Sequence, residues 1–113
     1  MNKEQELIKF WTYFGFEKDK LKYVDGEIHY KEELSRWLWL GISLDTLYKY
    51  AIPKLQNKGY SIELLAYEYK SFGVFINDEI HEVIFPEVRN DNPVEALSNA
   101  ILMVIDKENN GKH

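Results

Sequence analysis

The alternation of apolar and polar residues is clearest near the end of the chain, where "NDNPVEALSNAILMVIDKEN" occupies residues 90–109. Asn92 has a side chain that can cap a helix, Pro93 suits the first helical position, and Glu95 stands three residues after the cap. The apolar residues that follow cover about 200° of a helical wheel. They are Val94, Ala96, Leu97, Ala100, Ile101, Met103, Val104 and Ile105. So wide a face predicts a helix that packs onto a sheet. We expect the last residues, about 108–113, to fray.

Two further helices are predicted upstream. Residues 4–15 carry apolar side chains at helical spacing and end at Gly15. Residues 44–60 carry a second apolar stripe, for which Ser43 and Asp45 are alternative N-caps.

Pro53 interrupts this second stripe. Proline has no backbone N–H, so the bond to the carbonyl of Lys49 is lost. We therefore expect a kink or a restarted helix at Pro53, with Gly59 as the terminating residue.

Residues 20–30 predict a β-hairpin, because Asp25-Gly26 is a dipeptide that a type I′ turn favours. This turn fixes which residues lie opposite one another. The predicted pairs are Tyr23 with Ile28, Leu21 with Tyr30, and Lys22 with His29.

Three more strands are predicted at 60–70, 72–76 and 80–85. The turn between the last two uses either Asn77-Asp78 or Asp78-Glu79, and the two choices give opposite registers. We favour Asp78-Glu79, because it groups the apolar pairs. In that register, Val74 lies opposite Val83, Phe72 opposite Phe85, and Ile76 opposite His81.

The order of elements predicts an α+β protein with a single domain over 1–113. An antiparallel sheet, made of three C-terminal strands plus the N-terminal hairpin, packs against two or three helices around an α-β-β-β-α core. The segment 31–43 fits one helical turn or an extended run, and its pattern leaves both open.

Charge and composition limit the classes of function that the sequence favours. The 113 residues contain no cysteine and carry a net charge of −5. Residues 1–58 have a balance of +1 and residues 59–113 a balance of −6, which argues against nucleic-acid binding. The α-β-β-β-α order is also that of double-stranded-RNA-binding domains, but "EVRNDNPVEALSN" lacks their lysines. No run approaches ~20 apolar residues, so we expect no membrane span.

The sequence offers no constellation for catalysis. His29, His81 and His113 have no partners at a recognised metal-ligand spacing, and no nucleotide-binding, hydrolase or zinc-protease motif occurs. We therefore expect no catalytic residues, no metal, no cofactor and no enzymatic activity.

Two surfaces are candidates for binding. One is an acidic edge, which could meet a basic partner, made of Asp78, Glu79, Glu82 and Glu87. The other follows from the 15% aromatic content and is a patch made of Trp37, Trp39, Tyr67 and Tyr69.

Three stretches resemble the phage ABA-sandwich domain family and related small phage and prophage proteins. They are "LSRWLWL" (34–40), "LYKYAIPKL" (47–55) and "NPVEALSNAILMVIDKE" (92–108). The middle one is similar to an aromatic-x-Tyr-x-x-Pro-Lys-Leu pattern, whereas the tryptophan often seen in the sheet is replaced by Phe72 or Phe75.

The resemblance implies an accessory protein in the cytoplasm of a bacterial host cell, and it supplies no catalytic residues. We expect a non-enzymatic module that binds a host protein. The alternatives are a small-molecule or nucleotide-binding protein and an oligomeric scaffold, and a homo-oligomer stays open.

Overall fold

The computed structural model describes residues 3–33 and 36–110. The chain divides into two compact units, Met1–Ile42 and Ser43–His113, and each is described by itself. The α+β prediction is confirmed, because helices occur together with antiparallel sheets. The single domain remains a prediction. Residues 34–35 of the segment 31–43 and the last three residues of the tail, His113 among them, lie outside the described residues.

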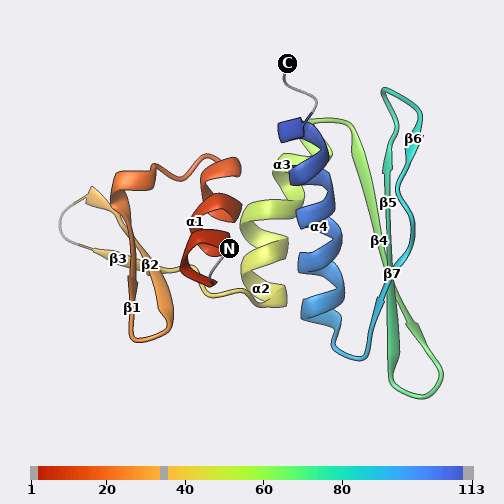
Figure 1. Cartoon of the computed structure of the whole chain (residues 1–113), viewed down its shortest axis with the longest axis horizontal. Coiled ribbons are helices and arrows are strands. Elements are labelled where there is room, and N and C mark those ends of the chain that lie inside the picture. Colours follow the sequence, from red (N-terminus) through yellow and green to blue (C-terminus); the bar gives the residue numbers. More distant parts are fainter. Residues whose placement is uncertain (1–2, 34–35, 111–113) are drawn as a thin grey trace. The chain divides into compact units, whose positions relative to one another are not determined.

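The N-terminal unit contains a helix and a three-stranded antiparallel meander in the order β1-β2-β3 (Figure 1). The hairpin therefore forms a sheet with β3, separate from the sheet of the C-terminal strands. Its elements are α1 (Lys3–Tyr13), η1 (Lys18–Lys20), β1 (Leu21–Val24), β2 (Glu27–Lys31) and β3 (Trp37–Trp39).

Aromatic side chains of α1 and the turn after it form much of this unit's core. Phe10, Trp11 and Phe14 are buried, and the Phe10 and Trp11 rings pack edge to face with centroids 4.9 Å apart. The indole Nε1–H of Trp11 donates to the carbonyl of Leu40 over 2.7 Å. Gly15 follows the helix with a φ of 96°, as its predicted role as terminator requires.

The predicted hairpin register is confirmed in all three pairs. Asp25 and Gly26 have φ of 53° and 79°, as a type I′ turn requires. The described end of the ambiguous segment is extended. Trp37–Trp39 pairs with β2, which places Trp37 opposite Lys31 and Trp39 opposite His29.

The C-terminal unit contains the remaining helices and a four-stranded antiparallel sheet (Figure 1). Its elements are α2 (Leu44–Thr46), η3 (Leu47–Ala51), α3 (Ile52–Asn57), β4 (Tyr60–Tyr67), β5 (Ser71–Asp78), β6 (Val83–Ile84), β7 (Val88–Asn90) and α4 (Pro93–Asn110).

The helix restarts around Pro53, as predicted. Ser43 is the N-cap, because its hydroxyl accepts from the backbone N–H of Thr46 over 3.1 Å. The next turn widens into the π-helical η3, and α3 begins with Pro53 in its first turn. There the missing N–H leaves no regular helical bond unmade. Gly59, with a φ of 96°, follows the helix end.

The predicted register of the last strands was wrong. β5 continues to Asp78, which lies opposite Val83, and Val74 lies opposite Val88 of β7 instead. The turn is longer than two residues, because the side chain of Asp78 binds the backbone of the loop that follows. The register that groups the apolar pairs requires a two-residue turn, which is shorter than the turn that the structure contains.

β4 also ends earlier than predicted, at Tyr67, because Tyr69 and Lys70 take positive φ in the turn to β5. β5 is then the central strand. It pairs with β4 along one edge and with β6 and β7 along the other.

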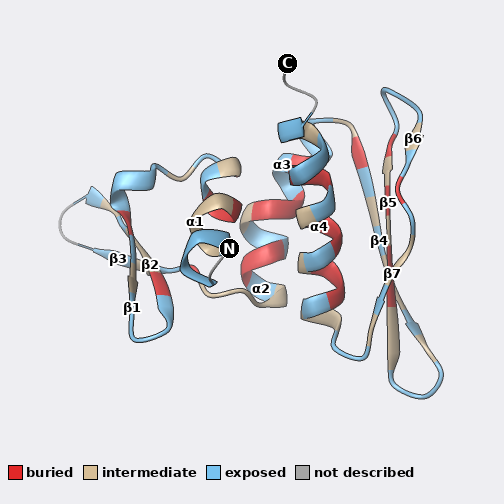
Figure 2. Ribbon diagram, viewed as in Figure 1, coloured by how far each residue is buried: buried red, intermediate tan, exposed pale blue. Residues whose placement is uncertain are grey.

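The predicted Asn92 cap of α4 is confirmed, since its Oδ1 accepts from the backbone N–H of Val94 over 2.8 Å and of Glu95 over 3.2 Å. One face of α4 is buried and packs on β5 and β7 (Figure 2). Met103 is exposed, so the buried face is narrower than predicted. No helix in the described ranges is long and apolar enough to span a membrane.

Candidate functional site

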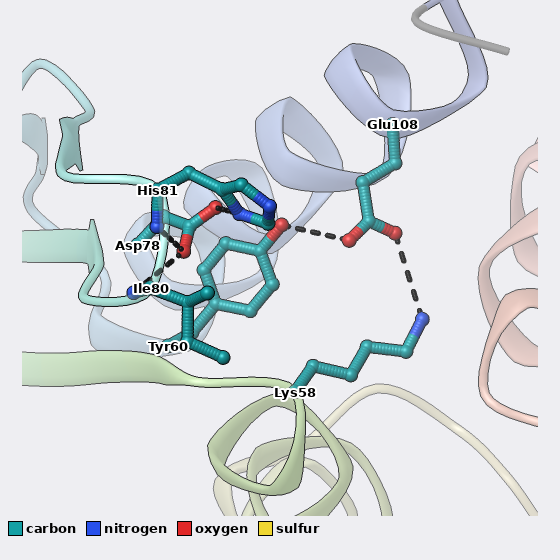
Figure 3. A network of polar contacts seen from close by, with 6 residues as sticks. All are labelled: Lys58, Tyr60, Asp78, Ile80, His81 and Glu108. Carbon is teal, nitrogen blue, oxygen red and sulfur yellow. Dashed lines mark hydrogen bonds and ion pairs between the residues drawn. The ribbon is translucent and has the colours of Figure 1, made fainter.

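The loop between β5 and β6, residues 79–82, is built around the last residue of β5. Asp78 Oδ1 accepts the backbone N–H groups of Ile80 over 3.1 Å and of His81 over 3.0 Å (Figure 3). Asp78 Oδ2 lies 2.8 Å from His81 Nδ1. Asp78 is only 8% exposed. These bonds tie the loop to the end of the sheet, so its backbone has a defined conformation.

The donors around Asp78 favour its charged form. The backbone N–H and the imidazole of His81, together with the N–H of Ile80, hold the pKa of Asp78 below its usual range, against the opposing effect of burial. The folded state therefore has a lower carboxyl pKa than the unfolded chain. The resulting stabilisation is present above the unfolded pKa and is lost as the pH falls through the folded pKa.

A second set of contacts joins the start of β4 to the end of α4. The hydroxyl of Tyr60 donates to Glu108 Oε1 over 2.7 Å, and Lys58 Nζ lies 3.5 Å from Glu108 Oε2 (Figure 3). Burial, followed by the bond to the carboxylate, raises the pKa of Tyr60 far above its ordinary value. The Tyr60 hydroxyl thus stays protonated and acts as a donor.

An open hollow of about 530 Å³ lies beside these contacts. It is lined by Tyr60, Asp78, His81, Val83, Phe85, Lys107 and Glu108. Lys107 Nζ lies 5.0 Å from the centroid of the Phe85 ring, so an ammonium group and an aromatic wall adjoin. The hollow offers apolar surface with charges of both signs. Within the described ranges, no group of three or more His, Asp or Glu is placed to hold a metal ion.

The His81–Asp78 pair is explained by the loop. A carboxylate beside an imidazole can take part in proton transfer. Here, however, one oxygen of Asp78 receives two backbone N–H groups and the other faces the imidazole. Both oxygens are therefore engaged in fixing the loop.

Two aliphatic side chains of this hairpin are exposed to solvent. Ile80 is 66% exposed and Ile84 is 79% exposed. Ile80 lies over Gly59, where an added Cβ would collide with the isoleucine side chain. The backbone N–H of Glu79 also donates to the carbonyl of Gly59 over 2.9 Å. Glycine at 59 therefore provides the room in which the loop sits.

The structure brings three of the four predicted acidic residues together at this loop. Asp78 is buried at its base, whereas Glu79 and Glu82 are exposed on it. Glu79 Oε1 also accepts from the hydroxyl of Ser61 over 2.7 Å. Glu87 belongs to a different cluster, so the acidic surface is smaller than predicted.

That second cluster joins Glu87, Tyr67 and Arg89. Glu87 accepts from the Tyr67 hydroxyl over 2.7 Å and from Arg89 Nε over 3.2 Å, and the Arg89 guanidinium lies 4.1 Å from the Tyr67 ring centroid. An added Cβ at Gly73 would collide with Glu87 and Tyr67. The three side chains therefore lie directly over the backbone of Gly73.

The predicted aromatic residues fall in two units. Trp37 and Trp39 lie on β3 in the N-terminal unit. In the C-terminal unit, Tyr67 ends β4 and Tyr69 lies in the turn to β5. Tyr67 is half-buried in the cluster with Glu87, whereas Tyr69 is 96% exposed. The predicted patch therefore takes two of its residues from each unit.

Sequence reasoning missed the Asp78–His81 contact, the Tyr60–Glu108 bond and the exposure of Ile80. The first had a signal, because an aspartate often binds the backbone two or three residues later. The Tyr60–Glu108 bond joins residues 48 positions apart, and no local pattern predicts it. None of the family models, curated proteins or solved structures compared with the chain matches it.

Acid should release the loop by protonating Asp78. Carboxyl-carbon NMR should give a titration midpoint for Asp78 below the usual range for aspartate, because its donors stabilise the charged form. The amide signals of Ile80 and His81 should move with the same midpoint.

Asp78→Asn is the matched control, since it keeps an oxygen acceptor but cannot ionise. Its Ile80 and His81 amides should lose that titration. A wild-type midpoint at or above the usual range would contradict this account.

Proposed function

We propose that the protein is a non-enzymatic binding module that modulates another protein, with the β5–β6 hairpin as its contact surface. The observation that carries the proposal is the exposure of Ile80 and Ile84 on a hairpin whose loop Asp78 fixes. Large exposed apolar patches rimmed by polar residues mark interaction sites, and these two isoleucines would form the apolar part of such a patch.

The surroundings of these isoleucines favour a particular kind of partner. Glu79 and Glu82 are exposed on the same loop. An apolar pocket flanked by lysine or arginine would complement both the aliphatic side chains and the carboxylates. Because the loop is already held in one conformation, little ordering entropy opposes binding.

Two further observations support the wider proposal. The stretches that resemble the phage ABA-sandwich family favour a phage or prophage accessory protein whose partner is a protein of the bacterial host. The engagement of both Asp78 oxygens in the loop favours binding over catalysis.

The test is capture of a partner from bacterial lysate on immobilised protein, followed by its identification and a direct affinity measurement by calorimetry. Ile80→Asp and Ile84→Asp should each weaken binding about tenfold or more, because burying one isoleucine contributes ~1.5–3 kcal/mol. The double charge reversal Glu79→Lys with Glu82→Lys should also weaken binding.

Tyr69→Asp is the matched control, because it adds the same charge at an exposed turn in the same unit. It should bind as the wild type does. If no specific partner is captured, or if all the variants bind alike, the proposal fails.

A further inference from the structure

One face of the N-terminal sheet carries aromatic and cationic side chains. Alternate residues of a strand point to the same face, and residues paired across strands share a face. Ile28 is buried, whereas most of its neighbours on the opposite face are exposed. The register places these residues on that opposite face: Lys22, Val24, Glu27, His29, Lys31, Trp37 and Trp39.

Both tryptophans on this face are open to solvent but held in position. Trp37 is 48% exposed and Trp39 is 44% exposed. Lys22 Nζ lies 5.9 Å from the centroid of the Trp37 ring. The Trp39 indole lies against Gly41, where an added Cβ would collide with the ring. Large rings fixed in this way lose little freedom when a ligand stacks on them.

A hollow of about 330 Å³ opens on the same face. It is lined by Lys22, Val24, His29 and Trp37. An indole, an imidazole and an aliphatic side chain provide flat and apolar walls, and an ammonium group stands beside them. These walls suit a flat ring with an anionic substituent.

Charge on this face differs from that of the whole chain. Of the residues on this face of the three strands, Glu27 alone is acidic, whereas Lys22 and Lys31 are cationic. The acidic excess of the chain lies in residues 59–113. The acidic residues that disfavour nucleic-acid binding by the chain as a whole therefore lie outside this surface.

We propose that this face binds single-stranded nucleic acid, with successive bases stacked on Trp37 and Trp39 and phosphates contacting Lys22 and Lys31. Alternate residues of a strand lie about 6.8 Å apart, so two aromatic rings so spaced can each stack one base of an extended strand. A duplex hides the faces of its bases, and stacking therefore selects the single strand.

The test is fluorescence anisotropy with a labelled single-stranded DNA of about 10 nucleotides. Trp37→Leu and Trp39→Leu keep an apolar side chain but remove the stacking surface, and each should weaken binding roughly tenfold. Lys22→Gln and Lys31→Gln should each reduce the slope of log affinity against log salt by about 0.7.

Tyr23→Leu is the matched control, because it removes a ring from the opposite face of the same sheet, where Tyr23 pairs with Ile28. It should leave the affinity unchanged. Absence of wild-type binding at about 100 μM protein, where even non-specific complexes form, would overturn the proposal. Equal weakening by Tyr23→Leu, equal binding of a duplex, or binding of an acidic peptide in place of DNA would also overturn it.

A measurement on the wild type covers the case in which a tryptophan variant fails to fold. Stacked bases should shift the indole N–H NMR signals of Trp37 and Trp39, whereas the buried Trp11, bonded to Leu40, should not respond. Unmoved Trp37 and Trp39 signals at saturating DNA would refute stacking. The result does not depend on Ile80 or Ile84, so it stands or falls separately from the proposed protein-binding function.

Discussion

Replacing Trp11 with alanine should lower the free energy of unfolding of the N-terminal unit by about 3–5 kcal/mol. Trp11 is fully buried, its ring packs against Phe10 and Phe16, and its Nε1–H donates to the Leu40 carbonyl over 2.7 Å. Alanine would leave a cavity and remove the donor for that carbonyl. Hydrogen exchange at the β1–β2 amides in increasing denaturant measures the loss.

Trp11→Phe is a graded comparison, since it removes the donor and part of the volume but keeps an aromatic ring. It should cost less than Trp11→Ala. Trp37→Ala, at an exposed position, should cost less still. A Trp11→Ala loss no larger than that of Trp37→Ala would show that the aromatic core does not support this unit.

Replacing Ile101 with alanine should destabilise the C-terminal unit by about 2–5 kcal/mol. Ile101 is fully buried on α4, the helix that packs on β5 and β7, and truncation would leave a cavity. Hydrogen exchange at the amides of β5 and α4 measures the change. Met103→Ala is the matched control two residues later, on the exposed side of the same helix.

Met103→Ala should change stability by no more than about 0.5 kcal/mol. If the two substitutions lowered the free energy of unfolding equally, the result would contradict the described orientation of α4 on the sheet.

The elements that the sequence predicted well are those with local causes. Asp25-Gly26 sets its hairpin through positive φ in two adjacent residues, and Asn92 starts α4 through bonds to residues two and three positions later. Pro53 restarts its helix because it has no N–H to donate. In each case the decisive residues are neighbours in the chain.

The predictions that failed concern carboxylates whose hydrogen bonds do not show in the hydrophobic pattern. The β5–β6 register was chosen by apolar pairing, but Asp78 and its loop fixed a longer turn and brought Val88 opposite Val74. The four predicted acidic residues do not form one surface. Glu87 instead accepts hydrogen bonds from Tyr67 and Arg89 in a second cluster.

The exposure of Ile80 and Ile84 could not be predicted from the pattern. Ile80 lies in the loop and not on the predicted strand, and the alternating pattern around Ile84 does not show which face of the strand is covered. The same limit applies to Trp37 and Trp39. Their exposure depends on which face of the hairpin the helix α1 and its turn occupy, and that choice is made by tertiary packing.

The distribution of tryptophan has a spectroscopic consequence. All three indoles, Trp11, Trp37 and Trp39, lie within Met1–Ile42. Intrinsic emission excited selectively at indole therefore arises from the N-terminal unit alone, and a melting curve recorded in this way contains no signal from the chromophores of residues 43–113. Acrylamide should quench the two β3 fluorophores and leave a shielded component from Trp11, so a single optical experiment separates the interior of one unit from its surface.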